Sequence, residues 1–194
     1  RLTTKVQVRY LLSGGLFGVA LGIFLMHGIE LNSGWSALII GFLVAGIGSG
    51  FVNPPLASTA IGVVEQRRSG MASGINSTFR QVGIASGVAG LGAIFQSRVT
   101  SQLAENVAGT PAAKHADQLS AAVTAGQTQQ ALDAISSRVS PAELTRITDG
   151  AHLAFISGMN TLFIVTCAIA LIGSIGAFFL VRQSDFVAPP GHEG

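Results

Sequence analysis

Long segments without charged residues dominate the hydrophobic pattern of this chain. Runs without Asp, Glu, Lys or Arg extend over residues 10–29, 31–64, 69–79, 81–97 and 150–181. A membrane-spanning helix needs about 20 mostly apolar residues, and Arg80 joins the third and fourth runs into one segment of that kind. The pattern therefore predicts an all-α membrane protein with four transmembrane helices.

The same runs predict how the chain is divided. In order, we expect a cytoplasmic loop at 1–9, three transmembrane helices within 10–98, an extracytoplasmic loop with short helices at 99–150, a fourth transmembrane helix at 151–182 and a cytoplasmic tail at 183–194. Arg9, Arg67, Arg68 and Arg182 flank the spans on one side, and basic residues in short loops mark the cytoplasmic face. The chain begins without an initiator Met, so we expect it to be the C-terminal part of a longer protein.

Composition agrees with a membrane protein. Of 194 residues, 48% are hydrophobic and 10% are charged, against about 25% charged residues in soluble domains. The net charge of +2 says little about partners by itself, and we expect no nucleic-acid partner. The single cysteine, Cys167, lies within the last span, which excludes an intrachain disulfide and a cysteine metal cluster.

The predicted extracytoplasmic loop has a helical pattern of its own. Apolar residues there are spaced for short amphipathic helices; they include Leu103, Val107, Leu119, Val123, Leu132 and Ile135. Ser140, Pro141 and Glu143 have the types and spacing of a helix start with a capping box. We therefore expect this loop to be partly helical.

Glycines are spaced along the predicted spans so that they share helix faces. Small residues on one face let neighbouring helices approach closely in a membrane. We assign helix packing to Gly14, Gly18, Gly22, Gly46, Gly50, Gly83 and Gly87.

Pro54 and Pro55 interrupt the second predicted span. Two prolines remove two backbone donors, which predicts a kink or break near Val52. A kinked span exposes carbonyls to a cavity or to a neighbouring helix. Asn53 then either lines a pathway or serves only the shape of the bundle, and the sequence leaves both interpretations open.

Arg80 is the one charge inside a predicted span. An Arg at mid-bilayer costs roughly 2.5–3.5 kcal/mol on insertion scales and usually faces a bundle interior or a water-filled cavity. The alternative is a side chain that snorkels to the cytoplasmic interface. Together with Arg80 we select four neutral polar residues in or beside the spans as candidates for transport or gating: Asn53, Asn76, Gln81 and Asn160.

The chemistry of an enzyme is missing from the sequence. It contains no nucleophile elbow, no paired Cys or His at metal spacing and no acidic pair within a span, which are the parts that membrane hydrolases and metalloenzymes require. We expect no catalytic residue, no metal site and no cofactor.

Several motifs carry a family resemblance. Four motifs follow one another along the chain: Arg1-Leu-Thr-Thr-Lys5, Gly46-x-Gly-x-Gly50-x-x-x-Pro54-Pro55, Arg67-Arg68-x-Gly70 and Asn76-x-x-x-Arg80-Gln81-x-Gly83-x-x-x-Gly87. With them the chain resembles the last four helices of the 14-helix drug:proton antiporter branch of the major facilitator superfamily. This resemblance covers residues 1–96; the rest of the chain matches in layout alone.

The resemblance implies a fold of two six-helix halves around a central cavity, with two extra helices between them. It implies export of small hydrophobic or cationic compounds in exchange for protons, across the bacterial cytoplasmic membrane. The partners are then the lipid bilayer, the substrate, protons and the N-terminal transmembrane helices, which would also hold the proton-binding carboxylate. The alternative from another class is a small four-helix accessory or scaffold membrane protein without transport activity of its own.

Overall fold

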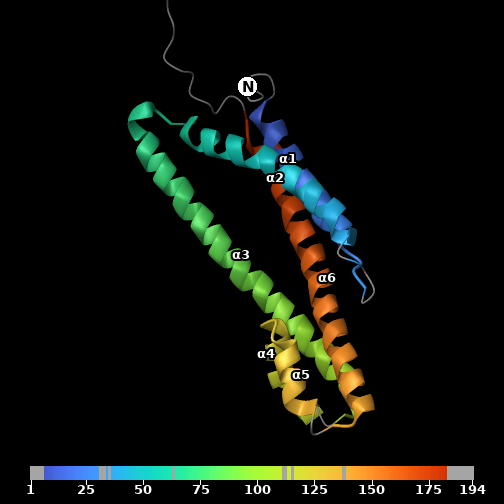
Figure 1. Cartoon of the computed structure of the whole chain (residues 1–194). Coiled ribbons are helices and arrows are strands. Elements are labelled where there is room, and N and C mark those ends of the chain that lie inside the picture. The colour runs from blue at the N-terminus through green and yellow to red at the C-terminus, as the bar shows by residue number, and fades with distance from the viewer. Residues whose placement is uncertain are drawn as a thin grey trace, which may run out of the picture. The chain divides into compact units, whose positions relative to one another are not determined.

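The computed structural model describes residues 7–30, 34, 36–62, 64–110, 113–114, 116–136 and 139–182, except the side chains of residues 37, 55, 57–62, 66 and 135. In these ranges the elements are α1 (Val8–Leu25), α2 (Ser36–Gly62), the short 3-10 helix η1 (Gln66–Arg68), α3 (Ser69–Asn106), α4 (Ala116–Thr124), α5 (Thr128–Ser136) and α6 (Pro141–Leu180) (Figure 1). Because no strand occurs among the described residues, the predicted all-α class is confirmed.

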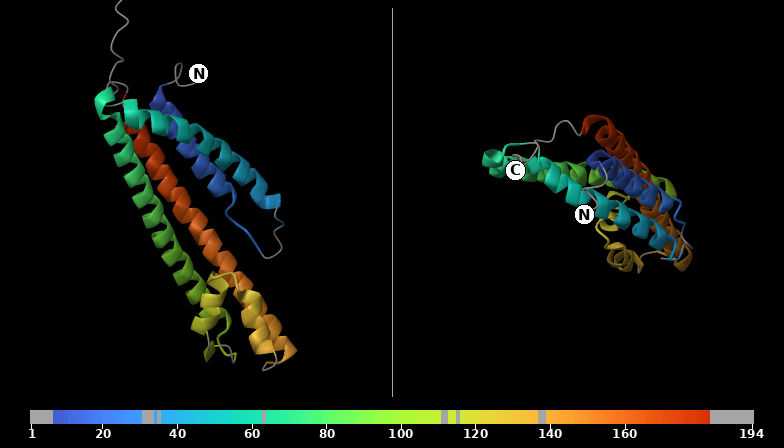
Figure 2. Two further views of the ribbon diagram at one scale, coloured as in Figure 1. Left: turned by 60° about the vertical axis from the view of Figure 1, so that its left-hand side comes forward. Right: turned by 90° about the horizontal axis from the view of Figure 1, so that it is seen from above.

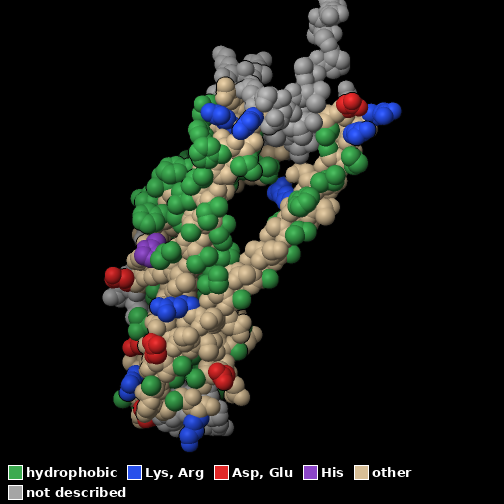
Figure 3. Space-filling view, turned by 180° about the vertical axis from the view of Figure 1, so that it is seen from behind, with side chains coloured by type: hydrophobic (Ala, Val, Ile, Leu, Met, Phe, Trp, Pro, Cys, Tyr) green, Lys and Arg blue, Asp and Glu red, His purple; other side chains and the backbone are tan. Residues whose placement is uncertain are grey.

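Three of the described helices, α1, α3 and α6, are long and apolar enough to cross a membrane. Within α2 the apolar stretch that the structure describes is shorter and covers Leu38–Pro54. The fourth transmembrane helix therefore stays a prediction. Figure 3 shows apolar side chains spread over the long helices, the surface expected where lipid tails surround a helix.

The chain forms two compact units. Unit 1 comprises Arg1–Met26, Ser36–Ser86 and Val165–Gly194, and unit 2 comprises His27–Trp35 and Gly87–Ile164. The helices α3 and α6 each run through both units.

In unit 1, α1 and α2 pack side by side and antiparallel (Figures 1 and 2). Glycine makes this contact possible. A methyl group on Gly48 would lie 2.6 Å from the carbonyl oxygen of Gly15 and 2.6 Å from the backbone nitrogen of Val19. A methyl group on Gly22 would lie 2.6 Å from the carbonyl oxygen of Gly41. Because only hydrogen fits at these positions, the two backbones approach closely without interlocking side chains.

This contact uses two of the glycines that the sequence assigns to helix packing, and the other assignments stay predictions. Gly18 and Gly22 face α2, and Gly15, Gly41 and Gly48 take part in the same contact. A methyl group on Gly14, Gly46, Gly50, Gly83 or Gly87 would meet no heavy atom of the described chain within 4 Å. The reason is helical phase: neighbouring residues differ by about 100° around a helix, so a shift of one residue leaves the contact face.

The C-terminal half of α6 joins α1 in unit 1. The Ser174 hydroxyl donates a buried hydrogen bond of 2.8 Å to the carbonyl oxygen of Ser13. The ring of Tyr10 lies edge-on to that of Phe178, with centroids 6.1 Å apart. Cys167 is a buried free thiol on the same part of α6. A hydroxyl bonded to a backbone carbonyl is a common link between helices in apolar surroundings.

Unit 2 holds a conventional hydrophobic core, which we call the cap core. Its buried members are Val99, Leu103 and Val107 from α3 and the turn after it, Leu119 and Val123 from α4, Leu132 from α5, and Ile147, Ala151 and Ala154 from α6. The short helices α4 and α5 occupy the segment for which the sequence predicted amphipathic helices. Because α3 and α6 also supply core residues, both helices continue past the expected spans at 69–98 and 151–182.

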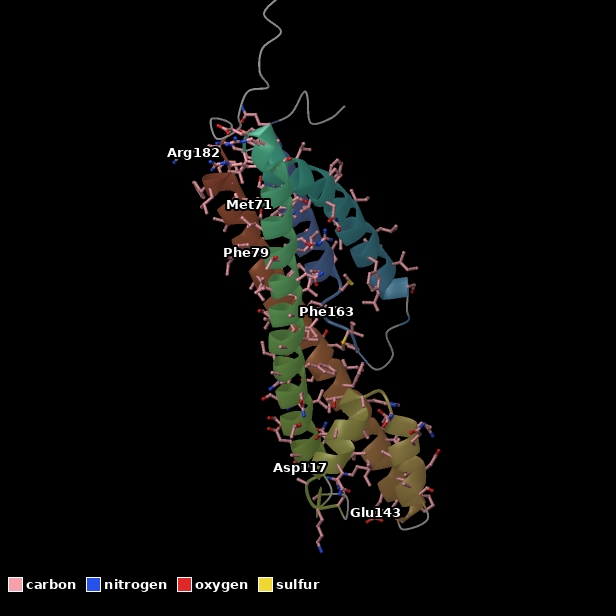
Figure 4. All side chains as sticks on the ribbon, turned by 90° about the vertical axis from the view of Figure 1, so that its left-hand side faces the viewer. Met71, Phe79, Asp117, Glu143, Phe163 and Arg182 are labelled. Carbon is pink, nitrogen blue, oxygen red and sulfur yellow. The ribbon has the colours of Figure 1, made fainter. Side chains whose placement is uncertain are left out.

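The start of α6 is a capping box. The Ser140 backbone N–H and hydroxyl donate to the Glu143 carboxylate, at 3.0 Å and 2.8 Å, and the Glu143 N–H donates to the Ser140 hydroxyl at 3.4 Å. The backbone hydrogen bond from Ser140, followed by that of its hydroxyl, lowers the pKa of Glu143 below its ordinary value of 4.5. The Glu143 carboxylate accepts from the backbone N–H of Ser140, and the Ser140 hydroxyl accepts from the backbone N–H of Glu143, so two N–H groups that a helix start leaves unpaired are both satisfied. In Figure 4, Glu143 lies at the start of α6.

Candidate functional site

Arg80 lies on a small, polar face of α3. Its side chain is exposed, and within the described part of the chain no hydrogen bond or ion pair reaches its guanidinium. Asn76, Arg80, Gly83 and Gly87 fall within about 60° of one another around the helix. Asn76 is half-buried, and the two glycines leave open space in front of the backbone. The face can therefore admit a guanidinium, a partner for it or a bound molecule next to the backbone.

A second face of α3 is apolar. Met71, Ile75, Phe79 and Val82 are 59%, 49%, 73% and 56% exposed, and their centre lies about 100° from the Arg80 face. Figure 4 shows Met71 and Phe79 on the same helix. An apolar face beside a polar one is the arrangement of a helix that meets lipid or other helices on one side and a polar space on another.

Gln81 does not join the Arg80 face. One residue further along α3, it points about 100° away from Arg80. Its side chain is exposed. Although Arg80 and Gln81 are neighbours in sequence, the helix does not bring their side chains to one place.

Asn53 lies on α2, where a polar patch follows from the prolines. Its amide nitrogen donates to the Ser49 carbonyl oxygen at 3.0 Å and to the Ser49 hydroxyl at 3.2 Å. Since Pro54 and Pro55 have no N–H, the carbonyls of Gly50 and Phe51 lack their usual helical donors. The patch consists of acceptors, namely these carbonyls and the free amide oxygen of Asn53.

The sequence predicts a kink or a break in this helix, and no break occurs in the part that the structure describes. α2 continues as one helix from Ser36 to Gly62, and its ribbon bends along its length (Figure 1). A bend without a break is a usual response of a helix to proline, because the remaining hydrogen bonds hold its two parts together. The side chain of Pro55 lies outside the described residues, so the bend is attributed to the lost backbone donors alone.

Asn160 holds the backbone that follows α1. Its Oδ1 accepts hydrogen bonds from the N–H groups of Gly28 and Ile29, both at 3.1 Å, and its Nδ2 donates to the Ile29 carbonyl oxygen at 3.0 Å. Gly28 has a φ of +87°, which favours glycine. The amide thus satisfies three backbone groups of an irregular segment, which is a positioning role; no substrate contact is needed to explain this residue.

Three of the five candidates therefore stand apart. Arg80 and Asn76 share a face of α3, whereas Gln81, Asn53 and Asn160 lie on other faces or helices. The sequence analysis also missed polar contacts, including a 3.2 Å hydrogen bond from Arg98 Nε to the Ser157 hydroxyl. Partners 59 residues apart carry no local signal that identifies the pair.

No group of three or more His, Cys, Asp or Glu residues comes together for a metal within the ranges that the structure describes. Near the first turn of α1, Arg9 forms an aromatic and cationic cluster with Tyr10 and Phe178. It does not involve any of the transport candidates.

Comparison with known proteins gives one relative. Over 104 residues the chain is 35% identical to a Streptomyces coelicolor protein named "Probable actinorhodin transporter". The match covers 51% of this chain and 18% of that protein, so the chain spans less than a fifth of the relative's length. No family model matches, and no solved structure does. Together with three helices of membrane-spanning length, the similarity supports a multi-pass membrane protein of transporter origin.

Proposed function

We propose that the chain is part of a proton-coupled efflux transporter of the 14-helix drug:proton antiporter branch, which exports small hydrophobic or cationic compounds across a bacterial cytoplasmic membrane. The observation that carries the proposal is the 35% identity to a transporter over 104 residues. The motifs around Gly46–Pro55 and Asn76–Gly87 agree with that branch. Lipid, substrate, protons and further helices of the same transporter are the partners.

In this proposal the Arg80 face of α3 borders the transport pathway. A guanidinium in a membrane requires acceptors, because an unpaired buried cation is not tolerated. The described part of the chain offers Arg80 none, and Gly83 and Gly87 leave room beside it. Helices outside this chain then supply the acceptor, either a carboxylate or carbonyl groups.

Arg80 acts in this proposal as a clasp or a gate. Its planar fork holds two acceptors at once, which lets it tie two helices together in one state and release them in the other. The exposed acceptors on α2, including Asn53, line another part of the pathway, where they suit cationic compounds. The proton-binding carboxylate comes from outside this chain, since the uncharged runs at 10–29, 31–64 and 150–181 hold no Asp or Glu.

The test uses the full-length transporter that contains this chain. Efflux of a cationic dye from cells or vesicles is measured and normalised to membrane-inserted protein for Arg80→Lys and Arg80→Ala. We expect both variants to lose transport by about tenfold or more, because Lys keeps the charge but loses the fork. Arg98→Lys is the matched control, since Arg98 lies on the same helix and bonds Ser157 with one nitrogen, and it should retain most activity.

Full efflux by Arg80→Lys together with little loss in Arg80→Ala would contradict the clasp or gate and favour a snorkelling side chain. Absence of efflux in the unmodified transporter, for every cationic dye tried, would count against the efflux function itself and favour an accessory or scaffold role.

A further inference from the structure

Where α1 begins, Arg9 contacts two neighbouring aromatic rings, an arrangement that we call the clamp. Its guanidinium carbon lies 4.9 Å from the ring centre of Tyr10 and 4.8 Å from that of Phe178. Its Nη2 donates to the Tyr10 hydroxyl at 3.2 Å. Phe178 in turn meets Phe179 edge-on at 5.3 Å. Two cation–π contacts and one hydrogen bond hold the side chain in a single position.

Among the described residues, the charge of Arg9 has no acidic counterpart. The first turn of α1 contains no acidic residue, and no carboxylate of the described chain pairs with the guanidinium. Nε is buried against the rings without a hydrogen-bond partner. Nη2 is therefore bonded to Tyr10, Nε is buried, and Nη1 has no acceptor among the described residues.

The surroundings are those of a membrane interface. Arg9 stands at the end of a helix long and apolar enough to span a membrane, and Tyr10, Phe178 and Phe179 are 47%, 37% and 66% exposed. Arg182 follows the end of α6 (Figure 4), the end of the helix that carries Phe178. Aromatic side chains at such a level contact glycerol and the first acyl carbons, while basic groups reach the phosphates.

We propose that Arg9, clamped by Tyr10 and Phe178, binds the phosphate of an anionic phospholipid in the leaflet on the side of the basic loops. The ligand is a phosphodiester headgroup such as that of phosphatidylglycerol: its phosphate meets Nη1, and its glycerol and upper acyl chain lie on the exposed rings. The adjacent apolar surface selects a lipid over a free phosphate ion. This inference does not rest on the transport function.

The clamp explains why this Arg makes a site when other basic residues do not. Arg67, Arg68 and Arg182 are exposed and have no ring contact among the described side chains. A flexible cation attracts anionic lipids from a distance but loses side-chain entropy on binding any one of them. Because Arg9 is already ordered, it loses less side-chain entropy when it binds a single headgroup.

The test is lipid binding to the purified 194-residue chain in neutral detergent. Phosphatidylglycerol or phosphatidylcholine of the same acyl composition is added, and bound lipids are counted by native mass spectrometry. We expect the unmodified chain to prefer phosphatidylglycerol by about fivefold, the effect of one basic group at an anionic surface. Arg9→Gln should remove this preference, and Phe178→Leu should lower it because the side chain is no longer clamped.

Two variants and one competitor keep the proposal falsifiable. Arg182→Gln removes the same charge at the same end of the helices and should keep most of the preference; an equal loss in Arg182→Gln and Arg9→Gln would overturn the site in favour of a diffuse basic rim. Arg9→Lys keeps the charge and serves as the second variant in case Arg9→Gln disturbs folding. It should lose part of the preference for phosphatidylglycerol. Displacement of phosphatidylglycerol by millimolar inorganic phosphate would overturn the lipid in favour of a soluble anion.

Discussion

The α1–α2 pair and the cap core pack in opposite ways. The cap core buries Leu103, Ile147, Val99, Val107 and Val123 completely. The pair instead brings glycine backbones together and leaves large apolar side chains outside, among them Ile40 at 64% and Phe42 at 62% exposure.

The contrast matches the packing that is expected in two different solvents. In water, burial of apolar area drives association, at about 25 cal/mol per Å². Between helices in lipid that force is absent, and close backbone contact and hydrogen bonds replace it. One chain thus uses both kinds of packing, and α6 takes part in both, through Ser174 in unit 1 and Ile147 in the cap core.

A cavity-forming substitution in the cap core should reduce stability most. Leu103→Ala should lower its local free energy of unfolding by about 3 kcal/mol, because it removes a fully buried side chain and leaves a cavity. The measurement is hydrogen exchange of the α4 and α5 amides in the purified chain. Leu153→Ala is the control, since Leu153 is 45% exposed in the same unit; similar losses of protection in both variants would contradict a water-excluding core.

The glycine contact is tested by adding bulk. Gly48→Val should destabilise the α1–α2 pair by about 2 kcal/mol, because its Cβ meets the Gly15 and Val19 backbones and neither can move aside as a side chain would. Unfolding in a denaturing detergent, followed by circular dichroism, measures the loss. Gly46→Val places the same group on the open face of α2. Equal stability of the two variants would mean that the close contact contributes nothing.

The smallest effect on stability is expected for the capping box at the start of α6. The hydrogen bonds from Ser140 lower the pKa of Glu143 below 4.5, so the charged carboxylate is the form that caps the helix. Its contribution is complete above the ordinary pKa and is lost as the pH falls through the lowered pKa. NMR titration of the Glu143 carboxyl carbon should give a midpoint below 4.5, and Ser140→Ala should raise it. A midpoint that Ser140→Ala leaves unchanged would argue against the box.

Local patterns were a good guide to the elements. The uncharged runs indicate where α1, α3 and α6 lie, and the spacing of Leu119, Val123 and Leu132 indicates two short helices. Ser140 and Glu143 identify the start of α6 because a capping box acts within four residues. These features depend on neighbours in sequence, which is why the chain alone specifies them. Residues 1–6 and 183–194 of the predicted loop and tail lie outside the described part.

The candidate site was harder to predict. Arg80 was identified as the lone charge in a span, and its lack of a partner within the described chain agrees with the need for acceptors from elsewhere. Gln81, a candidate because it is a neutral polar residue in a span, points away from Arg80. Asn160 was selected by type and turned out to hold a backbone segment more than 130 residues earlier in the chain.

The sequence by itself determined the helical class, the membrane-like composition, the amphipathic helices and the isolation of Arg80, because these follow from periodicity and charge along the chain. Only the tertiary structure decided which glycines face a neighbour, that Asn160 binds the backbone of Gly28 and Ile29, and that Arg9 contacts two rings. The reason is geometric: a helix offers several faces of similar composition, and which of them makes contact depends on the rotation and depth at which a distant helix packs.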